Sequence, residues 1–440
     1  MTTLKQEPDT NPDLEPDFDP YHFMFHGNAV RAPMYVPGAI AVLMVLLLII
    51  VNLLQGTFGG ADDFRFVDDL RRVFSSSVAA PSPPAFPLTR DVVSWLLLLS
   101  ILSGMLLLHR EWQLMKECIP ALVKNGVLVA CKPVRFDDGQ LDVVRTYGIN
   151  RLGRLMRIHR IVAECEPEDA LPTFLLAVKR SLRKKRSVTI VVLVLASIIL
   201  AGLLHHGEQE GLFTAFAPSG LSGDRLHTWL DASYRSWWAG DDHFWGQLLY
   251  QIYAIIAFLI IVSFNVVGMI ALYVVIGMKF VADPGADWFN RDQRYGWRPL
   301  AAVFRTVLLA VGLLGATLTV TMIAIGVRNF PWIGFVVSLY VLAVPLFVLA
   351  PAMIFRRTER TAKDMRVAEL IGMLDGVDVA QIDGLSRMAT VLNEIERCQS
   401  ARIRPLRMRS TGYATIISVW VLPILLTIIQ IYFPWLHASP

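Results

Sequence analysis

Seven long apolar stretches dominate this chain and restrict what it can fold into. Each is long enough, or nearly so, to cross about 30 Å of hydrocarbon as a helix. They cover residues 34–54, 92–108, 188–204, 248–278, 301–326, 333–355 and 413–433. Inside a bilayer only helices and closed barrels satisfy the backbone, and the two-residue alternation of barrel strands is missing. The sequence therefore predicts an all-α polytopic membrane protein with about seven transmembrane helices.

Composition excludes the main alternatives to a membrane protein. Of the 440 residues, 54% are hydrophobic and only 18% are charged. Charged residues usually make up about a quarter of a soluble protein. A water-soluble globule and a disordered chain are both excluded on this ground.

The distribution of Lys and Arg predicts the orientation of the chain. With the N-terminus inside, the segments between spans place 33 basic residues in the cytoplasm and 7 outside. Basic residues accumulate on the cytoplasmic side of membrane helices. We therefore expect a bacterial inner-membrane protein with a cytoplasmic N-terminus and an external C-terminus. All four cysteines fall in the segments assigned to the reducing cytoplasm, which agrees with this orientation.

Six regions follow from this topology. They are a disordered acidic tail at 1–33, spans one and two with an outer loop at 34–108, a basic cytoplasmic subdomain at 109–187, spans three to six at 188–355, a cytoplasmic helical hairpin at 356–412, and span seven with the outer C-terminus at 413–440. The apolar run at 126–131 predicts a strand, so the subdomain at 109–187 is expected to be small and mixed.

A basic cluster ends the region 109–187, directly before the third span. It contains Arg183, Lys184, Lys185 and Arg186. Such a cluster attracts anionic lipid headgroups, and ordinary anchoring at the cytoplasmic face is the favoured alternative explanation. Aromatic residues are not interleaved with these charges, so nucleic acid is not an expected partner.

The hairpin carries an apolar seam on its second helical run. Leu385, Met388, Leu392 and Ile395 recur at spacings of three, four and three residues. Asp383 precedes them as an expected helix N-cap. The seam is only about two heptads long, so it is expected to bind region 109–187, a protein partner or a second copy of the chain.

Polar and kinking residues inside the spans are the candidate functional positions. Asn265, Thr317, Thr321 and Gln430 are candidates for a polar path, and ordinary hydrogen bonds between or within helices are the alternative. Pro345, Pro351 and Pro423 are candidate hinges in spans six and seven. Small residues at close-packing spacing are Gly312 with Ala316 and Gly334 with Ser338.

Motifs that carry chemistry are missing from the sequence. It contains no phosphate-binding loop, dinucleotide fingerprint, HExxH or GxSxG, so neither an enzyme nor a cofactor is predicted. The histidines of the second outer segment, 205–247, do not have the spacing of metal ligands.

Three function hypotheses remain. The first is a channel-like membrane effector gated by a cytoplasmic ligand or partner, and the second is a non-conducting sensor or scaffold. The third is a transporter, which the lack of carboxylates in the span cores makes less favourable.

Overall fold

The structure is a computed structural model of the chain. It describes residues 35–59, 86–130, 158, 169–209, 213, 221, 223–288, 295–325, 338, 340, 359–374, 382–400, 421 and 425. Four helices among them are long and apolar enough to cross a membrane. These are α4 (Val92–Lys124), α8 (Ala170–Gly207), α11 (Phe244–Val281) and α12 (Arg298–Ile325). The prediction of an all-α membrane protein is thereby confirmed.

The second to fifth predicted spans lie within these four helices. The first predicted span forms α2 (Tyr35–Leu54), whose apolar part, Gly38–Leu54, is shorter than the four. Spans six and seven, at 333–355 and 413–433, lie outside the described residues apart from 338, 340, 421 and 425. The expected tail at 1–33 also lies outside them.

Two of the helices extend far beyond their apolar stretches. Helix α4 continues from the second span to Lys124 and ends where Gly126 adopts a φ of 64°. Helix α8 begins at Ala170, so the basic cluster Arg183–Arg186 lies inside it and not in a loop. The change from apolar to polar residues marks the expected membrane boundary, but it does not end the helix.

A short antiparallel strand pair joins the ends of α4 and α11. The strand predicted at 126–131 is β1 (Leu128–Ala130), and its partner is β2 (Ala282–Pro284), which directly follows α11. Val129 lies opposite Asp283. The partner strand thus comes from the loop after the fourth span and not from region 109–187. We call this part of the molecule, together with residues 359–400, the hairpin end.

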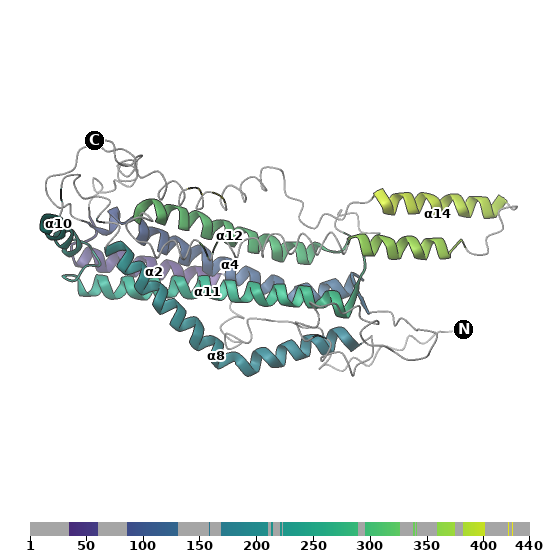
Figure 1. Ribbon diagram of the computed structural model, residues 1–440, viewed down its shortest axis with the longest axis horizontal. Helices are drawn as coiled ribbons and strands as arrows, with labels where there is room; N and C mark the ends of the chain where they lie inside the picture. The colour runs from purple at the N-terminus through teal and green to yellow at the C-terminus, as the bar shows by residue number, and fades with distance from the viewer. Residues whose placement is uncertain are drawn as a thin grey trace.

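At the opposite end of the bundle, the buried carboxylate of Asp91 contacts the indole groups of Trp237 and Trp238. Asp91 is fully buried and accepts hydrogen bonds from Ser94 N of α4 (3.1 Å) and from Ser94 Oγ (2.7 Å). The indole nitrogens of Trp237 and Trp238 each donate to Asp91 Oδ2 at 2.8 Å. We call this the aromatic end. It includes the 3-10 turn η4 (Leu88–Arg90) and helix α10 (Asp224–Arg235), opposite the hairpin in Figure 1.

Helix α8 packs on α11 with one half and exposes an apolar surface with the other. Phe174 is fully buried and its ring occupies the space that a side chain on Gly277 would need. Beyond the basic cluster, the helix exposes large apolar side chains such as Val188 (68%) and Ile199 (61%). This exposed stripe is what a lipid-facing helix presents. Figure 1 shows α8 as two arms that meet at a bend.

The expected hairpin is present as two helices. Residues 359–372 form the first, and α14 (Ile382–Ser400) forms the second. Leu370 packs against Val391 and Cys398 of α14, and Trp288, which follows β2, joins the same cluster. The hairpin is therefore attached to the bundle through Trp288. Asp383, expected to be an N-cap, instead lies in the first turn of α14.

A candidate ligand pocket in the helix bundle

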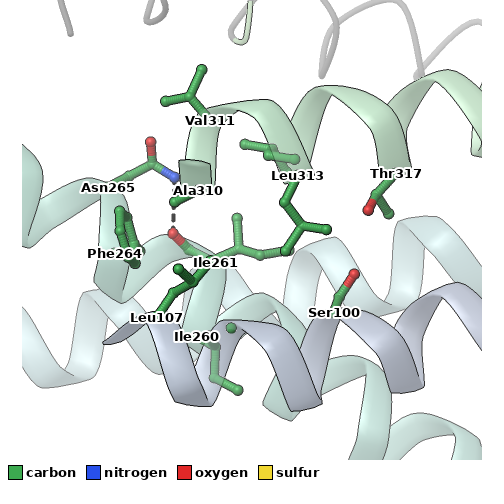
Figure 2. A pocket seen from close by; sticks show the side chains of 12 residues that line it. Ser100, Leu107, Ile260, Ile261, Phe264, Asn265, Ala310, Val311, Leu313 and Thr317 are labelled. Carbon is green, nitrogen blue, oxygen red and sulfur yellow. Dashed lines mark hydrogen bonds between the residues drawn. The ribbon is translucent and has the colours of Figure 1, made fainter. Parts of the chain in front are cut away.

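A pocket lies where α4, α11 and α12 meet (Figure 2). It is partly open, and its cavity volume is about 60 Å³. Its walls are mostly aliphatic, with Leu107 from α4, Ile261 and Phe264 from α11, and Val311 and Leu314 from α12. Such a lining suits an apolar molecule or an acyl chain.

Three polar side chains contribute to the pocket wall: Ser100 of α4, Asn265 of α11 and Thr317 of α12. The amide nitrogen of Asn265 donates to the carbonyl of Ile261 at 2.8 Å, which leaves the amide oxygen as an acceptor. Figure 2 shows the hydroxyl groups of Ser100 and Thr317 at the opposite end of the pocket from Asn265. The pocket therefore offers hydrogen-bonding groups at both ends and apolar surface between them.

The structure brings together two of the four predicted polar-path residues. Asn265 and Thr317 line the same pocket. Thr321 is not among the lining residues, and its hydroxyl donates to the carbonyl of Thr317 at 2.9 Å, the alternative expected for a threonine in a helix. Gln430 and the candidate hinges Pro345, Pro351 and Pro423 lie outside the described residues.

Close approach of α4 and α11 at the pocket depends on a glycine. A Cβ atom on Gly104 would lie 2.7 Å from Ile260 Cγ2, so no larger residue fits without displacement. Ser100 and Gly104 form a small-xxx-small pair, the spacing that lets membrane helices pack closely. For the pair predicted at Gly312 and Ala316, a Cβ atom on Gly312 would meet no atom of the described residues within 4 Å, so its packing stays a prediction.

The sequence analysis did not select Ser100 and Gly104, although two small residues at this spacing can be recognised in the sequence. Their four-residue spacing is the same as that of the pair proposed at Gly312 and Ala316. The sequence carries no information on which of several such pairs faces a neighbouring helix. That choice depends on the rotation of each helix about its axis.

An apolar layer separates the pocket from the aromatic end. Leu97 and Ile101 of α4 and Ala254 and Ala257 of α11 are buried between the pocket residues and Asp91. These side chains belong to one continuous cluster.

The other predicted sites lie on α8 and α14. Arg183, Lys184 and Lys185 are exposed and Arg186 is half-buried, so the cluster is accessible on α8. On α14, Leu385 and Leu392 are about half exposed, while Met388 and Ile395 are half-buried. The seam is thus only partly covered by the chain itself.

Within the residues that the structure describes, no three His, Cys, Asp or Glu side chains gather as a metal ion would require. No protein-family model, curated protein or solved structure matches the chain.

Proposed function

We propose that this protein is an integral membrane sensor that binds an apolar or amphipathic molecule. Binding changes the conformation of the bundle, and this change is transmitted to the hairpin. The main support is that α4 and α11 connect the two ends of the bundle. Both helices run without interruption from the aromatic end, past the pocket, to the strand pair at the hairpin end. At 1.5 Å per residue they are about 50 Å and 57 Å long.

The two helices are tied to each other at both ends. At the aromatic end, Asp91 at the start of α4 binds Trp237 and Trp238, which precede α11. At the hairpin end, β1 follows α4 and pairs with β2 after α11. A ligand that separates α4 from α11 at the pocket must therefore bend the helices or shift one of these ties. Trp288, which packs on the hairpin, lies four residues beyond β2.

The apolar layer of Leu97, Ile101, Ala254 and Ala257 supports a sensor that does not conduct ions. A charged ion crossing this layer would lose its hydration without gaining polar partners. One observation favours the alternative of a channel-like effector or a transporter, namely that Ser100, Asn265 and Thr317 share the pocket. Measurement of ion flux in liposomes separates these functions, and we expect no conductance and no saturable uptake.

We propose that the hairpin end lies in the cytoplasm of a bacterial inner membrane. Support comes from α8, where the exposed basic cluster is followed towards the aromatic end by the exposed apolar stripe. Anionic headgroups are the expected partner of the cluster. A protein partner or a second copy is the expected partner of Leu385 and Leu392.

Photo-crosslinking tests the pocket. A phospholipid with a photoreactive acyl chain is expected to label α4, α11 or α12 at the pocket. Ala310→Phe fills the pocket and is expected to abolish this labelling. The matched control is Ala316→Phe, on the same helix but on its exposed side, which should retain labelling. Equal labelling of both variants would contradict the proposal.

Cysteine labelling of intact cells tests the orientation. An impermeant maleimide is expected to reach Asp242→Cys at the aromatic end and to miss Ser386→Cys until the cells are opened. Both positions are exposed. Labelling of Ser386→Cys in intact cells would refute a cytoplasmic hairpin.

A further inference from the structure

A buried glutamate ends helix α8 at the aromatic end. Glu208 is the C-cap of α8 and its side chain is fully buried. Among the described residues its carboxyl oxygens make no hydrogen bond of standard geometry, although the Tyr250 hydroxyl lies close enough to interact with the carboxyl group. An ionised carboxylate in such a position would be unfavourable, because it would have lost water and gained little more than this one interaction.

The neighbours of Glu208 make its negative charge still less favourable. Asp91 lies nearby and already accepts four hydrogen bonds from Ser94, Trp237 and Trp238, the surroundings of a carboxylate anion. The C-terminus of α8 adds the negative end of the helix dipole. Burial and Asp91 together raise the pKa of Glu208 well above its ordinary value, and the Tyr250 hydroxyl offsets this in part.

The remaining titratable groups of this site come from three elements. His205 and His206 lie in the last turn of α8. The ring of His205 stacks on Trp237 at a centroid distance of 5.4 Å, and its Nε2 lies 3.3 Å from the Tyr234 hydroxyl. That hydroxyl donates to Asp241 at 3.3 Å. Tyr250 of α11 lies in the centre, with its ring 5.2 Å from that of Trp237.

Two further polar atoms of the site are buried and make no hydrogen bond of standard geometry to a described residue. They are Nδ1 of His205 and the hydroxyl oxygen of Tyr250. These atoms thus come from α8 and α11, and both helices meet Asp91 at the start of α4. The site joins three of the four helices that are long enough to cross the membrane.

We propose that Glu208 is a proton-binding site that holds the ends of α4, α8 and α11 together at the aromatic end. With a proton bound, Glu208 is neutral and packs beside Asp91. When the proton leaves, two negative charges share one buried site. Their repulsion and the cost of burying the second charge then favour a separated state in which Glu208 meets water.

The direction of the pH dependence follows from linkage. The packed state has the raised pKa and the separated state has the ordinary glutamate pKa of 4.5. The packed state is therefore fully favoured below pH 4.5 and becomes less favoured as the pH rises towards the raised pKa. In this interval the separated state gains tenfold in relative population for each pH unit.

Infrared spectroscopy of the 440-residue chain in lipid nanodiscs tests the proton site directly. A buried protonated carboxyl group has a C=O stretching band that differs from that of a carboxylate. We expect such a band to persist well above pH 4.5 and to be absent from Glu208→Gln. The control, Asp242→Asn, removes an exposed carboxylate of the same end and should leave the band unchanged.

The indole N–H signals of Trp237 and Trp238 test the coupling to the aromatic end. In the unmodified chain they are expected to shift with the same midpoint as the carboxyl band. In Glu208→Gln, which stays neutral, they should not shift at that midpoint. The proposal fails if no carboxyl band titrates above the ordinary range, if Glu208→Gln retains the band, or if the indole signals of Glu208→Gln shift as before.

Discussion

At the scale of single residues, small side chains and buried polar atoms determine how the helices meet. Gly104 lets Ile260 of α11 approach α4 at the pocket, and Gly277 accommodates the ring of Phe174 from α8. The hydrophobic pattern of a membrane span does not distinguish such glycines from Gly312, where an added Cβ atom would meet no described atom within 4 Å. Sequence reasoning selected Asn265 and Thr317 because polar residues in a span are conspicuous, and it missed Ser100 and Gly104.

Glu208 and Asp91 were missed for a different reason. Both lie just outside the predicted spans at 92–108 and 188–204, where a charged residue is expected to meet water. Their burial depends on loop segments that fold over the helix ends and bring Trp237 and Trp238 onto Asp91. That arrangement depends on contacts more than a hundred residues apart, which no local pattern encodes.

Alanine substitution of two glycines gives opposite effects on stability. Gly104→Ala places a Cβ atom against Ile260 and is expected to destabilise the protein by about 1–3 kcal/mol through overpacking. Gly312→Ala adds a methyl group that would meet no atom of the described residues, and it is expected to be neutral or to stabilise α12 by up to about 1 kcal/mol. Thermal unfolding in detergent measures both, and equal shifts in Tm would refute the packing at Gly104.

Removal of the Asp91 carboxylate should weaken the aromatic end. Asp91→Ala loses a helix cap and leaves two buried indole N–H groups unpaired, so a loss of about 2 kcal/mol or more is expected. Denaturant unfolding followed by tryptophan fluorescence measures it. Asp231→Ala, at an exposed position of α10, is the control and should change stability by less than about 0.5 kcal/mol.

At the scale of elements, the apolar stretches located the helices but not their ends. The 17 residues of the second predicted span are about half of α4, which has 33 residues. Polar residues after Leu108 remain helical because α4 packs on α11, α12 and β1, and Trp112 and Leu122 join one core with Phe174 of α8. Tertiary contacts, rather than the bilayer, determine where these helices end.

The hairpin was predicted with its two helices and its break, but the sequence could not identify which face of α14 is covered. Val391 and Cys398 are buried against Leu370, whereas Leu385 and Leu392 of the seam are exposed. Adjacent positions 391 and 392 therefore have different roles. One holds the hairpin together, and the other is available to a partner.

Charge substitutions at these two positions separate the roles. Val391→Asp places a charge in the buried contact and is expected to unfold the hairpin, which limited proteolysis detects as new cleavage between residues 359 and 400. Leu392→Asp should leave the hairpin protected but abolish association of the chain with a partner or a second copy. Analytical centrifugation or cross-linking measures that association, and loss of protection in Leu392→Asp would contradict this assignment.

At the scale of the whole molecule, α4 and α11 are connected at both ends, so a movement of one helix is expected to move the other. A disulfide between Val129→Cys and Asp283→Cys, which lie opposite each other in the strand pair, should form readily. If ligand binding is relayed through this pair, the cross-link is expected to preserve lipid labelling at the pocket. It should also abolish any ligand-dependent change in cleavage of the hairpin. Reduction of the disulfide is the control and should restore the response.

Helix α8 passes from its exposed basic cluster into its exposed apolar stripe without a break. A continuous helix of this kind cannot adjust at a loop when the hydrocarbon becomes thinner or thicker, so it must tilt or change its bend instead. Tilting moves Phe174, on the far arm, against Gly277. The protein is therefore expected to register bilayer thickness itself, and reconstitution in lipids of different chain length should alter the contact between α8 and α11.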